Sequence, residues 1–237
     1  MMLDLIIEGA TICDGSGAPA FRGCVGLEGD VIAYVREKSA PARERVAADG
    51  LVVAPGFIDP HTHYDVQVCW DRDLTPSSWF GVTTAIIGNC GVGLAPMRKT
   101  TRDALLHDLE NVEGLPFDLM APVVPNEDLS YARFTEWIER RGIRINLAPL
   151  VPLTPLRRCV LGEDASERAA TVTERRELVR HFEAAIEAGA FGFSTDYLAD
   201  HLGFRGRPLP CQLADMAELE DLCGVVRRRG GATLSVA

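Results

Sequence analysis

The sequence lacks the features of a secreted or membrane-embedded protein. Its first residues, MMLDLIIEGATICDG, have no basic segment, no continuous apolar core and no small-residue cleavage site, so we expect no signal peptide. It has no run of roughly 18 uncharged apolar residues, the length that a membrane-spanning helix needs. Its seven cysteines, an odd number without paired spacing, favour a reducing compartment over a disulfide framework. We therefore expect a cytoplasmic protein without a membrane partner.

Clusters of basic residues are also scarce. The formal net charge is −10, and the dense basic runs are Arg157-Arg158 and Arg227-Arg228-Arg229. The second run ends a predicted helix, where cations interact favourably with the helix dipole. A nucleic-acid-binding surface needs clustered Lys and Arg to neutralise phosphates. We therefore expect no nucleic-acid partner.

The first 50 residues have the pattern of a small β unit. Apolar residues alternate from Leu3 to Ile7, and the apolar runs 24–27 and 31–35 flank the turn sequence Glu28-Gly29-Asp30. A glycine-containing turn between two apolar runs is typical of a β-hairpin. A β unit this short can bury little core alone, so we expect it to be part of a larger assembly.

From residue 51 onward, short apolar runs alternate with helical patterns. The predicted strands are residues 51–54, 83–87, 145–150, 191–195 and 232–236, and the predicted helices are residues 130–141, 172–188 and 213–229. Near-continuous apolar runs are typical of buried parallel strands, and their alternation with helices indicates βα units. A closed barrel of such units has eight strands and about 250 residues. Residues 51–237 therefore predict an α/β fold with a parallel series of about five strands, fewer than the eight that a closed (β/α)8 barrel would need.

Capping signals predict where two of these helices begin. Ser130 precedes the apolar stripe of the helix over 130–141. Thr171 is followed three residues later by Glu174, which is the pattern of a capping box, and Gly189 is a stop signal for the same helix.

Two closely spaced histidines lie in the segment PGFIDPHTHYD, residues 55–65. Alternation along an extended chain sends residues i and i+2 to the same face, so His61 and His63 can point into one cavity. Functional residues of parallel barrels lie at the C-terminal ends of strands, and imidazole nitrogen is a favoured ligand of Zn²⁺. A surface His-X-His pair is the alternative. The preceding strand and the Gly-Phe-Ile-Asp sequence favour a metal site.

A cysteine follows the next predicted strand, in the segment GVTTAIIGNCG, residues 81–91. The flanking glycines allow close approach of the backbone. A thiolate at Cys90 could join the two histidines as a ligand, because a metal holds a coordinating thiol deprotonated. An inert buried cysteine is the alternative, and the position between glycines at a strand end favours the ligand.

These segments carry a resemblance to a known family. The sequences DLIIEGAT at residues 4–11 and DGSG at residues 14–17, together with residues 55–65 and 81–91, resemble the amidohydrolase superfamily. The subgroup that they resemble is the D-aminoacylase (N-acyl-D-amino-acid deacylase) family. The likeness runs through nearly the whole chain and is most specific between residues 51 and 97.

The resemblance implies a fold and a set of metal ligands. The family fold is a (β/α)8 TIM barrel with a small β-sandwich built from both ends of the chain. Residues 1–50 would then be the N-terminal part of the sandwich, and residues 51–237 the first part of the barrel. His61 and His63 match the family's His-X-His ligands and Cys90 matches its Gly-Asn-Cys-Gly cysteine, for one or two Zn²⁺ ions. The general-base aspartate of the family is expected beyond residue 237.

Two further residues have two interpretations each. Asp65 follows His63 by two residues and is interpreted as a residue that orients a metal ligand, with capping of the next turn as the alternative. His201 stands just past the fourth predicted strand, where a related subgroup also has a histidine. A substrate or metal role and an exposed loop position are both open for it.

The activity that the resemblance implies is zinc-dependent hydrolysis of a linear amide. The substrate would be a small N-acylated D-amino acid, and the products a carboxylate and the D-amino acid. The alternatives are a cyclic-amide hydrolase similar to dihydroorotase or hydantoinase, and a truncated, non-catalytic metal-binding scaffold. Because the expected general base and several barrel strands are missing, the 237 residues alone are expected to be inactive.

Overall fold

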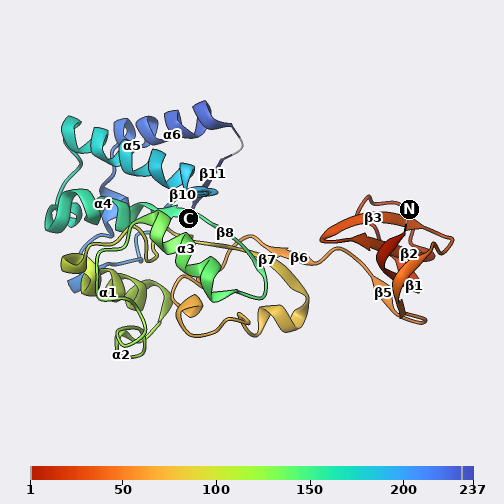
Figure 1. Ribbon diagram of the computed structural model, residues 1–237. Coiled ribbons are helices and arrows are strands. Elements are labelled where there is room, and N and C mark those ends of the chain that lie inside the picture. The colour runs from red at the N-terminus through yellow and green to blue at the C-terminus, as the bar shows by residue number, and fades with distance from the viewer. Residues whose placement is uncertain (1, 231) are drawn as a thin grey trace. The chain divides into compact units, whose positions relative to one another are not determined.

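The chain divides into two compact units. The computed structural model describes residues 2–230 and 232–237, and the units are Met1–Gly56 and Phe57–Ala237 (Figure 1). The first unit thus extends past the boundary predicted at residue 50, because residues 52 and 53 pair within its sheet.

The first unit is a five-stranded sheet. Its strands are β1 (Leu3–Ile12), β2 (Phe21–Glu28), β3 (Val31–Arg36), β4 (Ala42–Ala47) and β5 (Val52–Val53). The order is β3-β2-β1-β4, and β5 also pairs with β1. The predicted hairpin is confirmed, since β2 and β3 are antiparallel and Gly29-Asp30 forms the turn between them.

Gly9 allows β1 to pair with two successive parallel neighbours. It has a φ of +82° and lies at a bulge between Glu8 and Ala10. A side-chain carbon at this position would lie 2.8 Å from Asp49, so only glycine fits without rearrangement. Before the bulge β1 pairs with β4, and after it β1 pairs with β5. The prediction that residues 51–54 form the first barrel strand is therefore wrong, because Val52–Val53 completes the sheet of the first unit.

The second unit contains parallel strands that follow one another in chain order. They are β6 (Phe57–Asp59), β7 (Val82–Ile87), β8 (Asn146–Pro149), β9 (Val151–Pro152), β10 (Gly192–Thr195) and β11 (Thr233–Val236). They form the sheets β6-β7-β8 and β9-β10-β11, and every pairing is parallel. Only Leu150 separates β8 from β9, and its N–H donates to the carbonyl of Ile87 at 2.9 Å. The run 146–152 thus pairs with β7 in its first half and with β10 in its second.

This arrangement agrees with a partial barrel of βα units, although the number of strands differs from the prediction. Over the described residues of the second unit, six strands are present rather than about five, because Leu150 interrupts the third run. The runs predicted over residues 83–87, 145–150, 191–195 and 232–236 each contain a strand in the expected place. The first strand of this unit is β6, which was not predicted.

Helices connect these strands. They are α1 (Arg102–Glu113), α2 (Phe117–Met120), α3 (Tyr131–Arg141), α4 (Leu153–Leu161), α5 (Val172–Glu187) and α6 (Met216–Arg229). Short 3-10 helices cover Gln67–Cys69, Ser77–Phe80, Lys99–Thr101, Gly162–Ser166, Phe204–Gly206 and Pro210–Leu213. In Figure 1, α4, α5 and α6 lie side by side, and contacts join α4 to α5 and α5 to α6. Among the residues that the structure describes, no helix combines the length and apolar character needed to cross a bilayer.

The predicted helix starts are confirmed at two positions. The Ser130 hydroxyl accepts a hydrogen bond from the N–H of Arg133 at 3.2 Å, which caps α3. Thr171 and Glu174 form the predicted capping box at the start of α5. The helix predicted from residue 213 begins later, at Met216, because Asp215 is its N-cap.

Helix α4 carries two buried arginines that link it to other helices. The guanidinium of Arg158 donates to both carboxylate oxygens of Asp108 on α1, at 2.8 and 3.1 Å. Asp108 also accepts the N–H of Phe204 at 2.7 Å. The neighbouring Arg157 pairs with Glu218 on α6. A buried charge is tolerated only when its hydrogen bonds are satisfied, so these pairs fix the positions of the three helices.

We expect Asp108→Ala to lower the free energy of unfolding by about 3–5 kcal/mol, because Arg158 would be left buried and unpaired. The double variant Asp108→Ala/Arg158→Ala should lose less than the sum of the two single losses. Denaturant unfolding of all three variants measures this coupling. The control is Glu183→Ala, which removes the exposed partner of Arg228 and should change stability by no more than about 1 kcal/mol. Additive losses for the buried pair would contradict the prediction.

Candidate metal centre

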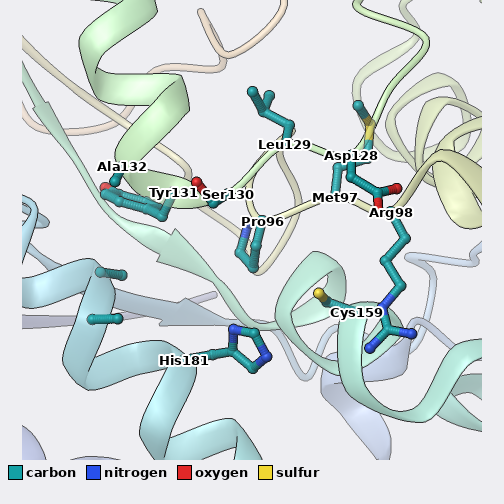
Figure 2. A pocket seen from close by; sticks show the side chains of 12 residues that line it. Pro96, Met97, Arg98, Asp128, Leu129, Ser130, Tyr131, Ala132, Cys159 and His181 are labelled. Atoms are coloured by element: carbon teal, nitrogen blue, oxygen red, sulfur yellow. The ribbon is translucent and has the colours of Figure 1, made fainter.

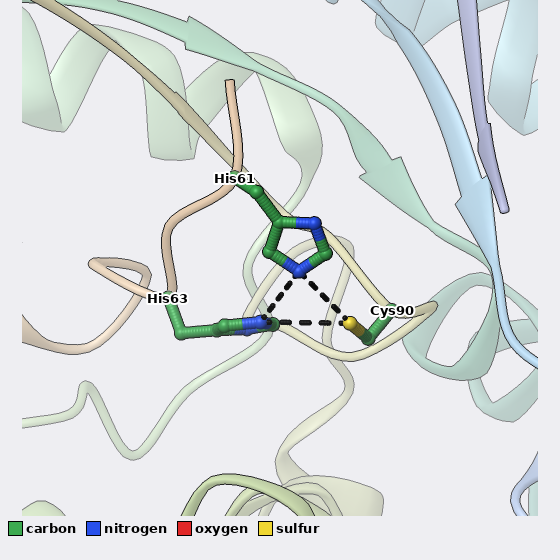
Figure 3. A group of neighbouring side chains, drawn as sticks. All are labelled: His61, His63 and Cys90. Carbon is green, nitrogen blue, oxygen red and sulfur yellow. Dashed lines mark hydrogen bonds between the residues drawn. The ribbon is translucent and has the colours of Figure 1, made fainter. Parts of the chain in front are cut away.

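Three potential metal ligands meet at the C-terminal ends of β6 and β7. His61 and His63 follow β6, and Cys90 lies in the loop after β7. Figure 3 shows the two imidazoles and the thiol pointing toward one another. The His61 Nε2 atom lies 3.3 Å from His63 Nε2 and 3.2 Å from Cys90 Sγ, and the third side of the triangle is 3.6 Å.

These separations fit a zinc-binding site. With bonds of about 2.0–2.1 Å to nitrogen and about 2.3 Å to sulfur, tetrahedral zinc needs nitrogens about 3.3 Å apart and nitrogen–sulfur pairs about 3.5 Å apart. The observed triangle is within a few tenths of an ångström of both values. Two imidazoles and a thiol are also the donor types that zinc prefers. The residues present therefore fit such an ion.

Thr62 explains why both histidines face the same way. Its N–H and its hydroxyl both donate to the carbonyl of Ile86, at 3.1 and 2.7 Å. The chain therefore continues alongside β7 after β6 has ended, with the Thr62 side chain turned toward that strand. Because side chains alternate along an extended chain, His61 and His63 turn to the opposite side.

The loop that carries Cys90 has an unusual backbone. Gly88, Cys90 and Gly91 have positive φ angles of 80°, 51° and 65°. A side-chain carbon at Gly88 would lie 2.6 Å from the carbonyl oxygen of Leu150. Glycine adopts this conformation without a steric cost, whereas the side chain of Cys90 makes it strained. Such backbone strain is typical of functional sites.

Side chains from other strand ends hold this loop. Asp65 accepts the N–H of Gly88 at 3.1 Å, and the Ser194 hydroxyl accepts the N–H of Gly91 at 3.0 Å while donating to the carbonyl of Gly88. Asn89 is itself fully buried and donates to the carbonyls of Thr62 and Ile86, at 3.1 and 3.0 Å. The backbone that positions Cys90 is thus fixed by hydrogen bonds on several sides.

Burial affects the protonation of Cys90 and of His63. It raises the pKa of the Cys90 thiol to about 12, with the carboxylates of Glu113 and Asp196 adding to the effect. It lowers the pKa of His63 to about 4, with additional repulsion from His61 and His201. At neutral pH His63 is therefore uncharged and has a lone pair to offer a cation. A bound cation stabilises the thiolate of a coordinating cysteine and offsets the cost of its burial.

Comparison with known proteins agrees with these observations. A family model described as "Amidohydrolase family" matches residues 44–122. The N-acyl-D-aspartate deacylase of Alcaligenes xylosoxydans xylosoxydans is 34% identical over 97% of this chain and 42% of its own length. The D-aminoacylase of the same organism is 34% identical over 96% of this chain and 43% of its own length. Over nearly its whole length, the chain is therefore similar to these two enzymes.

Solved structures of amidohydrolases show the same likeness. The N-acyl-D-glutamate deacylase of Bordetella bronchiseptica, crystallised with zinc and a phosphonate inhibitor, matches with a TM-score of 0.77 at 31% identity, over 100% of this chain and 45% of that one. A crystal structure of D-aminoacylase matches with a TM-score of 0.73 at 31% identity, over 97% of this chain and 44% of that one. The chain thus spans less than half the length of the relatives that it matches.

The other two candidate residues lie near the trio without touching it through a hydrogen bond. Asp65 is buried, which raises its pKa to about 7, and it holds the loop of Cys90 rather than a histidine. His201 is part-buried, and its Nδ1 lies 2.5 Å from Oδ2 of the fully buried Asp196. It is close enough to His63 to affect its pKa.

Three contributing residues were missed in the sequence. Ser194 and Asp196 lie at the end of β10, and Glu113 ends α1 with its Oε1 atom 3.3 Å from His63 Nδ1. Ser194 and Asp196 lie at the end of a predicted strand, and this position could have identified them as candidate site residues. Nothing in the sequence pattern distinguishes Glu113 from other helical acids.

A separate cavity lies outside the metal centre. Its volume is about 490 Å³, and Figure 2 shows Cys159 and His181 on its wall with Arg98 and Asp128 nearby. None of its lining residues belongs to the trio. Its walls are mostly apolar, and it contributes no ligand to the centre.

We expect Ser194→Ala to lower the free energy of unfolding by about 1–3 kcal/mol, because the buried N–H of Gly91 would lose its acceptor. It should also weaken zinc binding, since the loop of Cys90 would no longer be held. Denaturant unfolding and zinc titration measure the two effects. The control is Ser166→Ala, a buried serine in the 3-10 helix Gly162–Ser166, which should leave zinc binding unchanged. Equal zinc affinity in both variants would contradict this role of Ser194.

Proposed function

We propose that this chain supplies the metal-binding part of a zinc-dependent amidohydrolase that converts an N-acyl-D-amino acid into a carboxylate and a D-amino acid. The observation that carries the proposal is the convergence of His61, His63 and Cys90 at separations that suit tetrahedral zinc. The names of the relatives, deacylases of N-acyl-D-aspartate and N-acyl-D-glutamate and D-aminoacylase, support the substrate class.

In this proposal His61, His63 and Cys90 hold zinc, as one ion or as part of a pair. Related solved structures support both possibilities, because one is a zinc complex of an N-acyl-D-glutamate deacylase and another concerns the binuclear metal centre of D-aminoacylase. Bound zinc would lower the pKa of a water molecule to about 7 and polarise the scissile carbonyl. The reaction needs no organic cofactor.

The remaining residues of the site hold the Cys90 loop and the ring of His201 in position. Asp65 and Ser194 keep the loop of Cys90 in its strained conformation. Asp196 fixes the ring of His201 through Nδ1, which leaves Nε2 free to donate to or accept from a substrate. We propose that His201 contacts the substrate in this way. The general base that takes the proton of the water would come from a residue outside this chain.

We also propose the larger fold that surrounds the site. The second unit would be the first part of a (β/α)8 barrel, because its strands are parallel and follow in chain order. Strands β6 and β11 each pair with a single neighbour, so each has an edge at which a further strand could pair. The first unit would be part of a β-sandwich. We place the whole protein in the cytoplasm because of its unpaired cysteines.

We expect the chain to bind zinc, and Cys90→Ser to weaken binding by at least the roughly 10–100-fold that changes around a metal site typically cause. His61→Ala should have an effect of the same size. Competition with a chromophoric chelator measures the affinity. Cobalt substitution should give a thiolate-to-cobalt absorption band that Cys90→Ser abolishes. The control is Cys159→Ser, at a cysteine on α4 outside the trio, which should retain both signals. Wild-type chain that binds no zinc would refute the metal site.

We expect the protein, completed to the length of its relatives and loaded with zinc, to release the acyl group from N-acetyl-D-amino acids. The D-enantiomers should be favoured by about 100-fold or more in kcat/KM, because a pocket that pairs polar substrate groups discriminates strongly. Acetate release from the D- and L-forms of N-acetyl-aspartate, -glutamate and -leucine measures this. The zinc-loaded His61→Ala variant is the control.

Two results of the hydrolysis assay would contradict the proposal. Hydrolysis of hydantoins or dihydroorotate without acetate release would indicate a cyclic-amide hydrolase. Zinc binding without any hydrolysis would indicate a non-catalytic scaffold. The 237-residue chain tested alone is expected to bind zinc without turning over substrate.

A further inference from the structure

The two ring nitrogens of His63 have different surroundings. Its Nε2 atom points toward His61 and Cys90 (Figure 3). Its Nδ1 atom is buried without an aligned hydrogen bond, and Oε1 of Glu113 lies 3.3 Å from it. The two side chains are similarly shielded, with 18% of His63 and 17% of Glu113 exposed. A ligating histidine generally needs an acceptor for its second ring N–H.

The carboxylate of Glu113 lies at an electrostatically unfavourable position. Glu113 is the last residue of α1, where the helix dipole disfavours negative charge. Among the residues that the structure describes, no Lys or Arg pairs with it, and burial raises the pKa of its carboxyl group. Helix stability therefore does not explain a carboxylate at this position.

We propose that Glu113 is a positioning residue, whose carboxylate accepts the Nδ1 proton of His63 and so directs the Nε2 lone pair toward the metal. The inference rests on the proposed metal site. In this arrangement Glu113 fixes both the tautomer and the ring orientation of His63. Its negative charge also makes the imidazole a stronger donor to a cation.

The two relevant atoms need little movement to form this hydrogen bond. Their 3.3 Å separation is slightly longer than a usual N–H···O contact, and only the alignment is lacking. Glu113 is joined to the following loop by Gly114, which has a φ of +67° and open space around it.

The test compares Glu113→Ala and Glu113→Gln with the wild-type chain. Alanine removes the acceptor, and we expect zinc affinity to fall by about 10–100-fold. Glutamine keeps an acceptor oxygen without the charge, so the loss should be smaller. The control is Glu187→Gln, at the last residue of α5, where the carboxylate pairs with Arg229 on the surface. This variant should bind zinc as the wild type does.

A second measurement reports the tautomer directly. In metal-free protein at neutral pH, where His63 is uncharged, nitrogen NMR should show the proton of wild-type His63 on Nδ1. In Glu113→Ala the two tautomers should be mixed. Thermal unfolding in the presence of a chelator checks that the variants fold, and the nearly isosteric Glu113→Gln provides the test if alanine disrupts the helix end.

The possible outcomes separate this inference from the proposed function. Wild-type chain that binds no zinc refutes the metal site, while the tautomer measurement still tests Glu113. Zinc binding that is equally tight in wild type and Glu113→Ala, with an unchanged His63 tautomer, overturns the positioning role. Loss of affinity in the Glu113 variants together with a shifted tautomer supports it.

Discussion

The site depends on keeping the backbone of residues 88–91 buried, with Gly88, Cys90 and Gly91 in a left-handed conformation. A buried peptide group that lacks a hydrogen-bond partner costs about 1–3 kcal/mol, so this loop requires donors and acceptors from its surroundings. They come from Asp65 beyond β6 and from Ser194 on β10, while the buried Asn89 ties the loop back to Thr62. The hydroxyl of Ser235 on β11 reaches Asn89 at 3.2 Å. Residues at the ends of several strands therefore act together to fix the position of the Cys90 sulfur.

The charges around the trio favour a cation. The side chains of Asp65, Glu113 and Asp196 are shielded from solvent, and each adds to the raised pKa of the Cys90 thiol. The buried arginines of α4 pair with other carboxylates, Arg157 with Glu218 and Arg158 with Asp108. A divalent ion between the two imidazoles and the thiol would relieve this repulsion. The carboxylates that raise the pKa of the thiol thus also favour the binding of a cation.

The sequence allowed most of the fold and the trio to be predicted, for identifiable reasons. Apolar runs located β7, β10 and β11, and side-chain alternation placed His61 and His63 on one side. The start of the barrel was placed too early, because Val52–Val53 and Phe57–Asp59 are both short strand segments that the local pattern does not distinguish. Val52–Val53 pairs with β1 beyond the bulge at Gly9 and so belongs to the sheet of the first unit. Glu113 could not be predicted, since its role depends on how α1 packs beside His63 and not on a local pattern.

The hydrogen bonds of the cysteine loop also have a consequence for the order of folding. The trio lies within the first 90 residues, but Ser194 stands more than a hundred residues after Gly91 along the chain. Contacts of such long sequence separation form late, because a long segment must lose conformational freedom before they are made. During synthesis the three donors would emerge from the ribosome well before the residue that secures their loop. Zinc captured at that point would meet a flexible site, and its final affinity would develop only once β10 has joined the sheet.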